Sequence, residues 1–307
     1  MEIILQILLL ALGFVLLVKG ADWFVDGASG IAAKMHIPQL VIGLTIVAMG
    51  TSAPEAAVSI SAALKGSADI TIGNIVGSNI LNILIILGLA SVIVPIAVAK
   101  STIKIDIPYM LAISAILFLL GMDGTITLVD GLILLALFII YLAYMLYMAK
   151  HGNSEGDPVK NLKLWQALLF TVVGLVLIVL GANIAVDAAT ALARIFGLSE
   201  RFIGLTIVAL GTSLPELFTS VAAARKGNAD IAIGNIVGSN IFNILFIVGL
   251  SAMIVPVPFA ANFLIDTIVA IAAGVLLLLC SIRQKKLVRW HGVLMLLGYT
   301  AYFIYLL

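Results

Sequence analysis

The sequence carries very little charge. Of its 307 residues, 10% are Asp, Glu, Lys or Arg, whereas a soluble domain has about 25%. Hydrophobic residues make up 63%, and the mean hydropathy is +1.27. This composition excludes an ordinary soluble domain and indicates a protein that crosses a membrane several times.

Cysteine, histidine and basic runs are also scarce. The single cysteine, Cys280, excludes an internal disulfide framework. The three histidines are isolated from one another, so we assign them no metal-binding role. There is no basic tract and no basic patch interleaved with aromatic residues, so nothing points to a nucleic-acid partner. The apolar N-terminus lacks a preceding cationic region and a following small-residue cleavage site, and we expect a first transmembrane helix there.

Long apolar segments fill most of the chain. Each is about 20 residues long, the length that a bilayer core requires. We therefore expect an all-α polytopic membrane protein of ten transmembrane helices. A first five-helix repeat covers residues 1–149, a polar linker residues 150–161, and a second repeat residues 162–307. The expected spans are residues 2–28, 38–64, 69–95, 105–121, 126–149, 162–189, 199–225, 230–254, 262–281 and 288–306.

The two halves share a long near-identical stretch. Residues 43–95 and 204–256 align without a gap at an offset of 161 residues, and 37 of the 53 aligned positions are identical. Because five spans per repeat is an odd number, the second copy must enter the membrane from the opposite side. The sequence therefore predicts two inverted-topology repeats, an architecture common among secondary transporters.

The distribution of Lys and Arg predicts the orientation. In the loops, twelve of them fall on the side of the linker, and Lys65, Arg194 and Arg201 fall on the other side. Cytoplasmic loops carry the excess of positive charge. We therefore expect a multi-pass protein of the cell membrane with a cytoplasmic linker and both termini outside.

The motif Gly-Thr-Ser-x-Pro-Glu occurs at residues 50–55 and again at residues 211–216. Proline lacks an N–H and clashes with the preceding turn, so each motif predicts a helix broken at mid-membrane. Glu55 and Glu216 should then lie in the first turn after the break. A carboxylate at that depth is costly unless something offsets its charge, which makes a matched pair a candidate functional site. Carbonyls freed at the breaks would add oxygen ligands from Ala48, Thr51, Ala209 and Thr212.

A second motif, Gly-Asn-Ile-Val-Gly-Ser-Asn-Ile-x-Asn, spans residues 73–82 and 234–243. Ser78 and Asn82 are four residues apart and share a helix face, as do Ser239 and Asn243. Carboxylates, hydroxyls, amide oxygens and carbonyls are the ligands of a hard cation such as Ca²⁺. For four polar residues of the two motifs the alternative role is to hold helices together. These are Ser52, Ser213, Asn74 and Asn235.

With both motifs present twice, the sequence resembles the sodium/calcium exchanger family of the cation/calcium antiporter superfamily, in its compact prokaryotic form. The resemblance implies a cluster of cation sites at mid-membrane and a sliding movement of the first and sixth spans across the other eight. It also implies that Ca²⁺ and Na⁺ are the bound ions, that lipid surrounds the protein, and that no cofactor or protein partner is needed. The implied ligands are Glu55, Glu216, Ser52, Ser213, Ser78, Ser239, the carbonyls of Ala48, Thr51, Ala209 and Thr212, and Asn82 and Asn243.

We therefore expect an antiporter that exchanges Na⁺ for Ca²⁺ by alternating access. The resemblance implies about three sodium ions per calcium ion, and hence electrogenic transport. Asn243 stands where potassium-dependent relatives carry an acid, which favours independence from K⁺. A proton/calcium exchanger remains open, because the two glutamates could carry protons, and so does a cation channel. An enzyme is disfavoured, since the spans contain no Ser–His, paired Asp or His-Glu-x-x-His arrangement.

Overall fold

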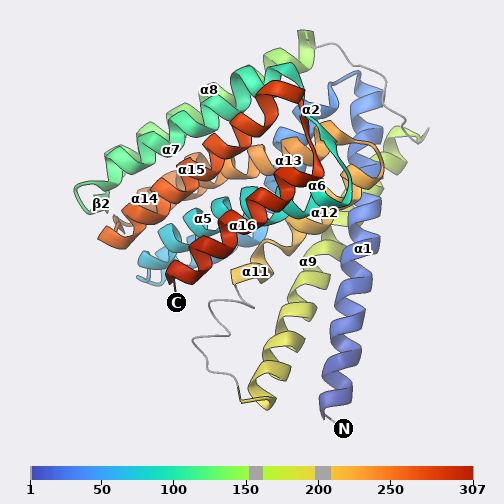
Figure 1. Cartoon of the computed structure of the whole chain (residues 1–307), viewed down its shortest axis with the longest axis horizontal. Helices are drawn as coiled ribbons and strands as arrows, with labels where there is room; N and C mark the ends of the chain where they lie inside the picture. Colours follow the sequence, from blue (N-terminus) through green and yellow to red (C-terminus); the bar gives the residue numbers. More distant parts are fainter. Residues whose placement is uncertain (1, 152–161, 198–208, 307) are drawn as a thin grey trace.

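The computed structural model describes residues 2–151, 162–197 and 209–306, and the fold is all-helical apart from four two-residue strands (Figure 1). Strand β1 (Ile96–Ala97) pairs antiparallel with β4 (Lys286–Leu287), and β2 (Thr125–Ile126) with β3 (Val257–Pro258). Each short pair joins a loop of one half of the chain to a loop of the other half. Each strand pair therefore connects the ends of helices from the two halves.

The helices of the first half follow one another with short connections. They are α1 (Glu2–Met35), α2 (Gln39–Ile42), the π-helical segment η1 (Gly43–Val47), α3 (Ala48–Thr51), α4 (Ala53–Leu64), α5 (Asp69–Leu81), the π-helical η2 (Asn82–Leu87), α6 (Gly88–Ile93), the π-helical η3 (Thr102–Asp106), α7 (Ile107–Gly121) and α8 (Leu128–His151).

The described part of the second half has a similar order, but α15 has no π-helical segment before it like the one that precedes α7. Its described elements are α9 (Leu164–Ile195), α11 (Ala209–Thr212), α12 (Leu214–Arg225), α13 (Ala229–Phe242), the π-helical η5 (Asn243–Val248), α14 (Gly249–Ile254), α15 (Ala261–Gln284) and α16 (Arg289–Leu306).

Most of the expected spans have a counterpart in the structure. Among the described residues, seven helical runs are long and apolar enough to cross a membrane, and the bent pair Gln39–Thr51 and Ala53–Leu64 adds an eighth. The span expected at 288–306 corresponds to α16, which begins with the polar residues Arg289 to His291 and is not among these eight. The start of the span expected at 199–225, the linker residues 152–161 and Arg201 lie outside the described residues.

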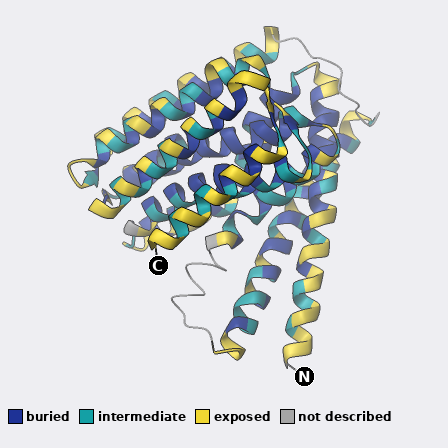
Figure 2. Ribbon diagram, viewed as in Figure 1, coloured by how far each residue is buried: buried dark blue, intermediate teal, exposed yellow. Residues whose placement is uncertain are grey.

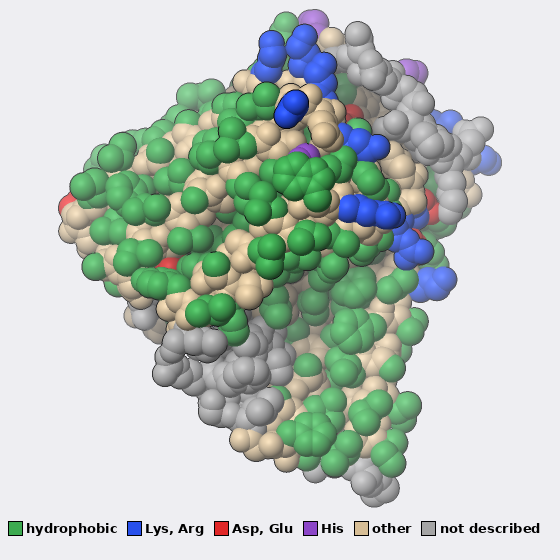
Figure 3. Space-filling view, viewed as in Figure 1, with side chains coloured by type: hydrophobic (Ala, Val, Ile, Leu, Met, Phe, Trp, Pro, Cys, Tyr) green, Lys and Arg blue, Asp and Glu red, His purple; other side chains and the backbone are tan. Residues whose placement is uncertain are grey.

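The helices that carry the second motif form the centre of the bundle. Within the most apolar window of α13 to α14, 94% of residues are buried, and within that of α5 to α6, 78%. The corresponding fractions are 22% for α8 and 28% for α15, which lie at the periphery (Figure 2). Hydrophobic side chains cover much of the visible surface, while Lys and Arg gather toward one end (Figure 3). An apolar outer face suits contact with lipid.

Helices α1 and α9 form a separate pair that extends away from the other helices (Figure 1). Glycines allow their backbones to touch. A Cβ atom added to Gly20 would lie 2.8 Å from the carbonyl oxygen of Gly174, and one added to Gly13 would lie 2.8 Å from that of Gly181. Earlier residues of α1 face later residues of α9, so the two helices run antiparallel. Such close contact between small residues is typical of helix pairs in membranes.

Candidate cation site

Both Gly-Thr-Ser-x-Pro-Glu motifs break their helices. Ser52 separates α3 from α4 with φ −82° and ψ 8°, and the two parts of this span meet at an angle of 49°. Ser213 separates α11 from α12 in the same way, with φ −92° and ψ 4°. Each proline occupies one of the first two positions of the helix that follows, where its missing N–H costs nothing. The predicted breaks are confirmed, as is the position of both glutamates in the first turn afterwards.

At each helix break, a serine hydroxyl donates a hydrogen bond to the glutamate carboxylate at the other break. Glu55 and Glu216 are each only 1% exposed. The Ser52 hydroxyl donates a hydrogen bond to Oε1 of Glu216 at 2.8 Å, and the Ser213 hydroxyl donates to Oε1 of Glu55 at 3.4 Å. Each serine of one repeat therefore orients the glutamate of the other. The carboxylates also sit at the N-terminal ends of α4 and α12, where the helix dipole favours negative charge.

Two asparagines fix the backbone at the glutamates. The Asn74 amide donates to the Ser59 hydroxyl at 2.9 Å and to the Glu55 carbonyl at 3.3 Å. Asn235 repeats this contact with the Glu216 carbonyl at 3.4 Å. Its own side-chain oxygen accepts a hydrogen bond from Thr51 at 2.9 Å. For these two asparagines the role of holding helices together, left open by the sequence, is the one that the structure shows.

A reciprocal network of asparagines joins α5 to α13. The Asn79 amide donates to the carbonyl of Asn240 at 3.3 Å, and the Asn240 amide donates to the carbonyl of Asn79 at 3.2 Å. The side-chain oxygen of Asn240 accepts a hydrogen bond from the Asn82 amide at 2.9 Å, and that of Asn79 accepts one from the Asn243 amide at 3.0 Å. Asn82 and Asn243 are also the first residues of η2 and η5. Such π-helical insertions frequently occur at functional sites.

Among the residues that the structure describes, four buried oxygens in these motifs have no hydrogen-bond partner. They are Oε2 of Glu55, Oε2 of Glu216, and the side-chain oxygens of Asn82 and Asn243. A buried acceptor without a partner costs about 1–3 kcal/mol, so four at related positions require an explanation. Carboxylate and amide oxygens are ligands of hard cations. No group of three or more His, Cys, Asp or Glu occurs among the described residues, so the site's negative charge comes from the two glutamates alone.

The other candidate ligands lie in the same motifs. Ser78 and Ser239 are buried, and the Ser239 hydroxyl donates to the carbonyl of Ala48 at 3.4 Å. That carbonyl also accepts the backbone N–H of Ser52 at 3.0 Å, so the helix break does not free it as the sequence analysis expected. The reason is that only one residue departs from helical geometry. Ala209 begins α11, although its side chain lies outside the described part, and Thr212 ends that helix.

The fold and the site define a polytopic membrane protein with a buried, oxygen-lined candidate site for a hard cation. Comparisons with known proteins agree. A family model described as sodium/calcium exchanger protein matches residues 5–147 and 166–307. The putative antiporter CaxA of Alkalimonas amylolytica is 42% identical, covering 94% of this chain and 95% of its own. Sodium/calcium exchanger MaX1 of Methanosarcina acetivorans is 35% identical over 99% of both chains.

Solved structures agree as well. One of the sodium-calcium exchanger NCX_Mj matches with a TM-score of 0.88 at 35% sequence identity, covering 99% of this chain and 100% of that one. The chain belongs to the sodium/calcium exchanger family.

Four further residues that were not predicted as structural partners make such contacts: Asn79, Asn240, Ser59 and Ser220. All four are buried and lie at the same 161-residue offset as the glutamates. That duplication is the signal that could have identified them. Their specific contacts could not be inferred, because each asparagine bonds to the opposite repeat and the offset alone does not indicate which side chains face each other.

Replacing Ser52 by alanine is expected to weaken calcium binding without preventing transport. The hydroxyl holds Oε1 of Glu216 at 2.8 Å, and loss of a group that orients a ligand typically costs 10- to 100-fold in metal affinity, so we expect at least a ~10-fold higher half-saturating Ca²⁺ concentration. Initial uptake rates over a Ca²⁺ series in proteoliposomes measure it. Ser114→Ala is a matched control, because that buried hydroxyl bonds only to the carbonyl of its own helix, at Met110. An unchanged half-saturating concentration in Ser52→Ala contradicts the positioning role.

Proposed function

We propose that this protein exchanges Na⁺ for Ca²⁺ across the membrane, using one buried site alternately open to either side. The observation that carries the proposal is the set of four unpartnered, buried oxygens from Glu55, Glu216, Asn82 and Asn243. A relative and a solved structure that both cover the whole chain are named sodium/calcium exchangers, which supports the same cations here.

The two glutamates determine the charge balance in this proposal. With one Ca²⁺ the carboxylates are neutralised, whereas with about three Na⁺ the site carries one net positive charge. Exchange would then move charge and respond to membrane potential. The proposed ligand shell adds hydroxyls and carbonyls around the four central oxygens. It comprises Ser52, Ser213, Ser78, Ser239, Thr51, Thr212 and Ala209.

We further propose that the two halves of the chain are inverted repeats of five spans each, residues 1–149 and 162–307, joined by a linker at 150–161. The antiparallel packing of α1 on α9 supports this, because equivalent helices of inverted repeats run in opposite directions. The paired hydrogen bonds support it too: the contacts of Asn79 and Asn240 are reciprocal, and so are those of the two glutamates. Inverted repeats are a common basis for alternating access.

In the proposed orientation the linker is cytoplasmic and both termini are outside the cell membrane. The support is the excess of Lys and Arg on the linker side of the sequence and the gathering of these residues toward one end in Figure 3.

We also propose independence from K⁺. At the position where an acid is associated with potassium co-transport, this chain has the neutral amide of Asn243, so a third carboxylate is missing from the site.

The proposal is tested by calcium-45 uptake into proteoliposomes at fixed pH. We expect uptake that requires an outward Na⁺ gradient, that accelerates when a potassium or proton ionophore dissipates the membrane potential, and that does not change when external choline is replaced by K⁺. Uptake driven by a pH gradient without Na⁺ would replace the proposal with a proton/calcium exchanger. Passive, uncoupled cation conductance would replace it with a channel.

A further inference from the structure

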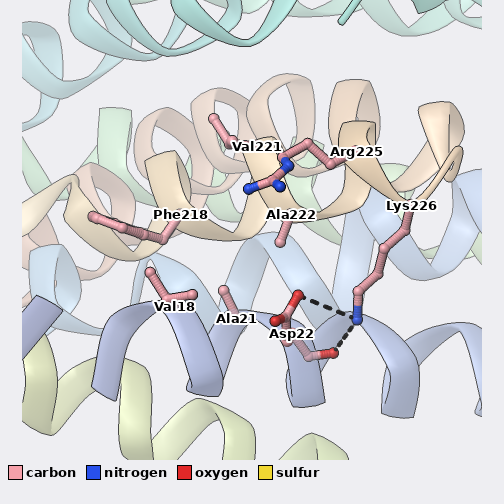
Figure 4. Close-up of a pocket in the computed structure, with 8 residues that line it drawn as sticks. All are labelled: Val18, Ala21, Asp22, Phe218, Val221, Ala222, Arg225 and Lys226. Carbon is pink, nitrogen blue, oxygen red and sulfur yellow. Dashed lines mark hydrogen bonds and ion pairs between the residues drawn. The ribbon is translucent and has the colours of Figure 1, made fainter. Parts of the chain in front are cut away.

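A cavity of about 310 Å³ lies between α1 and α12, along the stretch from Phe218 to Lys226 (Figure 4). Its walls are mostly apolar, from residues such as Val18, Ala21 and Phe218. Lys226 lies at its edge and reaches across from α12 to α1 (Figure 4). Helix α1 belongs to the separate α1/α9 pair, so this contact connects that pair to the remaining helices.

Lys226 bonds to two acidic residues of α1. Its ammonium lies 2.7 Å from Oδ1 of Asp26 and 3.4 Å from Oδ1 of Asp22, and it also donates to the Asp22 carbonyl at 2.7 Å. Asp22 and Asp26 are four residues apart and therefore share a face of α1. The Asp26 side chain is only 9% exposed, so water and salt screen this ion pair less than one on an open surface. Next to this ion pair, the Asn228 amide donates a hydrogen bond to the Ser29 hydroxyl of α1 at 2.8 Å.

The 161-residue offset gives this contact a counterpart in the other repeat. Lys226 corresponds to Lys65 at the end of α4, and Asp26 corresponds to Asp187 on α9. Both Lys65 and Asp187 are exposed, and within the described ranges no ion pair joins them. The same holds for the counterparts of Asn228 and Ser29. Ser67 and Thr190 share no hydrogen bond in the described part of the chain. The ion pair between Lys226 and Asp26 is therefore formed, whereas the equivalent ion pair between Lys65 and Asp187 is not formed in the described part of the chain.

The cavities beside these two contacts also differ from each other. A second cavity, of about 420 Å³, lies between α4 and α9 and is lined by Val179, Ala182 and Asn183. These are the counterparts of Val18, Ala21 and Asp22 in the first cavity. The second cavity extends to Pro54 and Thr212, beside the proposed ligands, whereas no proposed ligand lines the first. The side without the ion pair is thus the side on which open space approaches the site.

We propose that Lys226 with Asp26, and Lys65 with Asp187, are two alternating latches that close opposite sides of the transport site. The formed pair holds α1 against α12 and shuts the linker side. When the α1/α9 pair moves across the other helices, the first latch opens and Lys65 meets Asp187 to shut the opposite side. The inference rests on the proposed function, because it assigns to the latches the control of access to that same site.

The test compares the accessibility of the two cavities in the full-length protein in proteoliposomes. In a Cys280→Ala background, Ala222→Cys reports on the first cavity and Ala57→Cys on the second. Labelling rates are measured with a membrane-impermeant maleimide applied from each side. Lys226→Gln is expected to raise labelling at position 222 and to lower it at position 57, changing their ratio at least about fivefold, as loss of about 1 kcal/mol does. Lys65→Gln should change the ratio in the opposite direction.

Arg225→Gln is the matched control, because it removes a positive charge from the wall of the same cavity without breaking a described ion pair. Its ratio should stay within about twofold of the parent. A Lys226→Gln ratio no different from that of Arg225→Gln overturns the latch, and so does a rise at both reporters, which indicates general loosening.

Sodium-dependent calcium uptake in the same vesicles separates the two proposals. Uptake without a reciprocal change in labelling overturns the latch and leaves the proposed exchange intact. A reciprocal change in a protein that shows no sodium-dependent uptake overturns the proposed exchange, while the latch stands as the device that switches access.

Discussion

Replacing Glu55 or Glu216 by glutamine is expected to abolish sodium-dependent calcium uptake. Each substitution keeps the shape of the side chain but removes half of the site's negative charge, leaving one carboxylate to balance a divalent cation. Loss of an outer-shell partner already costs 10- to 100-fold, so loss of a charged ligand should lower uptake by at least about 100-fold. Both variants should fold, because the glutamine oxygen can still accept the hydrogen bond from Ser213 or Ser52.

The matched control for these variants is Asp123→Asn. It removes one negative charge as well, but Asp123 is exposed in the turn after α7. Uptake by the control should match that of the parent protein. Elution as a single symmetric peak in size-exclusion chromatography and an unchanged thermal unfolding midpoint establish that the glutamine variants are folded. Parent-like uptake by either folded glutamine variant would contradict the assignment of the site.

The second large effect is expected from adding one methyl group between α1 and α9. In Gly20→Ala the new Cβ would lie 2.8 Å from the Gly174 carbonyl oxygen and 2.8 Å from the Ile178 nitrogen, both of which are backbone atoms. Overpacking of this kind costs about 1–3 kcal/mol, because the backbones must separate. We expect a lower thermal unfolding midpoint and slower uptake, since this helix pair is the unit that we propose to move.

Gly298→Ala in α16 is the control for this prediction. Its added Cβ would meet only the Leu84 methyl groups, at 3.7 and 3.9 Å, which is ordinary van der Waals contact. The same change of residue should therefore leave both the unfolding midpoint and the uptake rate unchanged. A Gly20→Ala protein that is as stable and as active as Gly298→Ala would show that close contact between α1 and α9 is not needed.

The parts of the site that follow from local chemistry could be predicted from the sequence. Pro54 and Pro215 lack the N–H that an unbroken helix needs, so both breaks and the position of each glutamate after its break follow from the motif. The duplication at a fixed offset further indicated that the two glutamates act together. Each glutamate also accepts a hydrogen bond from the serine of the other repeat. This contact depends on how the two repeats pack together, so the motif alone could not predict it.

Other features depend on packing and were not predictable. The π-helical segments at Asn82 and Asn243 require one extra residue in a helical turn, and no local motif encodes that insertion. The carbonyl of Ala48 was expected to be free, but the break is only one residue long and its hydrogen bonds persist. The ion pairs of Lys226 join residues about 200 positions apart in sequence, so they emerge only once α1 lies beside α12.

The most direct test of the account is the position of a bound cation. Crystals of the protein soaked with Sr²⁺, a heavier substitute for Ca²⁺, can be measured at a wavelength that gives anomalous scattering. We predict one strong peak in contact with oxygens of both Glu55 and Glu216, at distances slightly longer than the about 2.3–2.6 Å of calcium because Sr²⁺ is larger, and its loss as Na⁺ in the soak is raised. A peak that contacts neither carboxylate, or one that persists in high Na⁺, would contradict a site shared by the two ions.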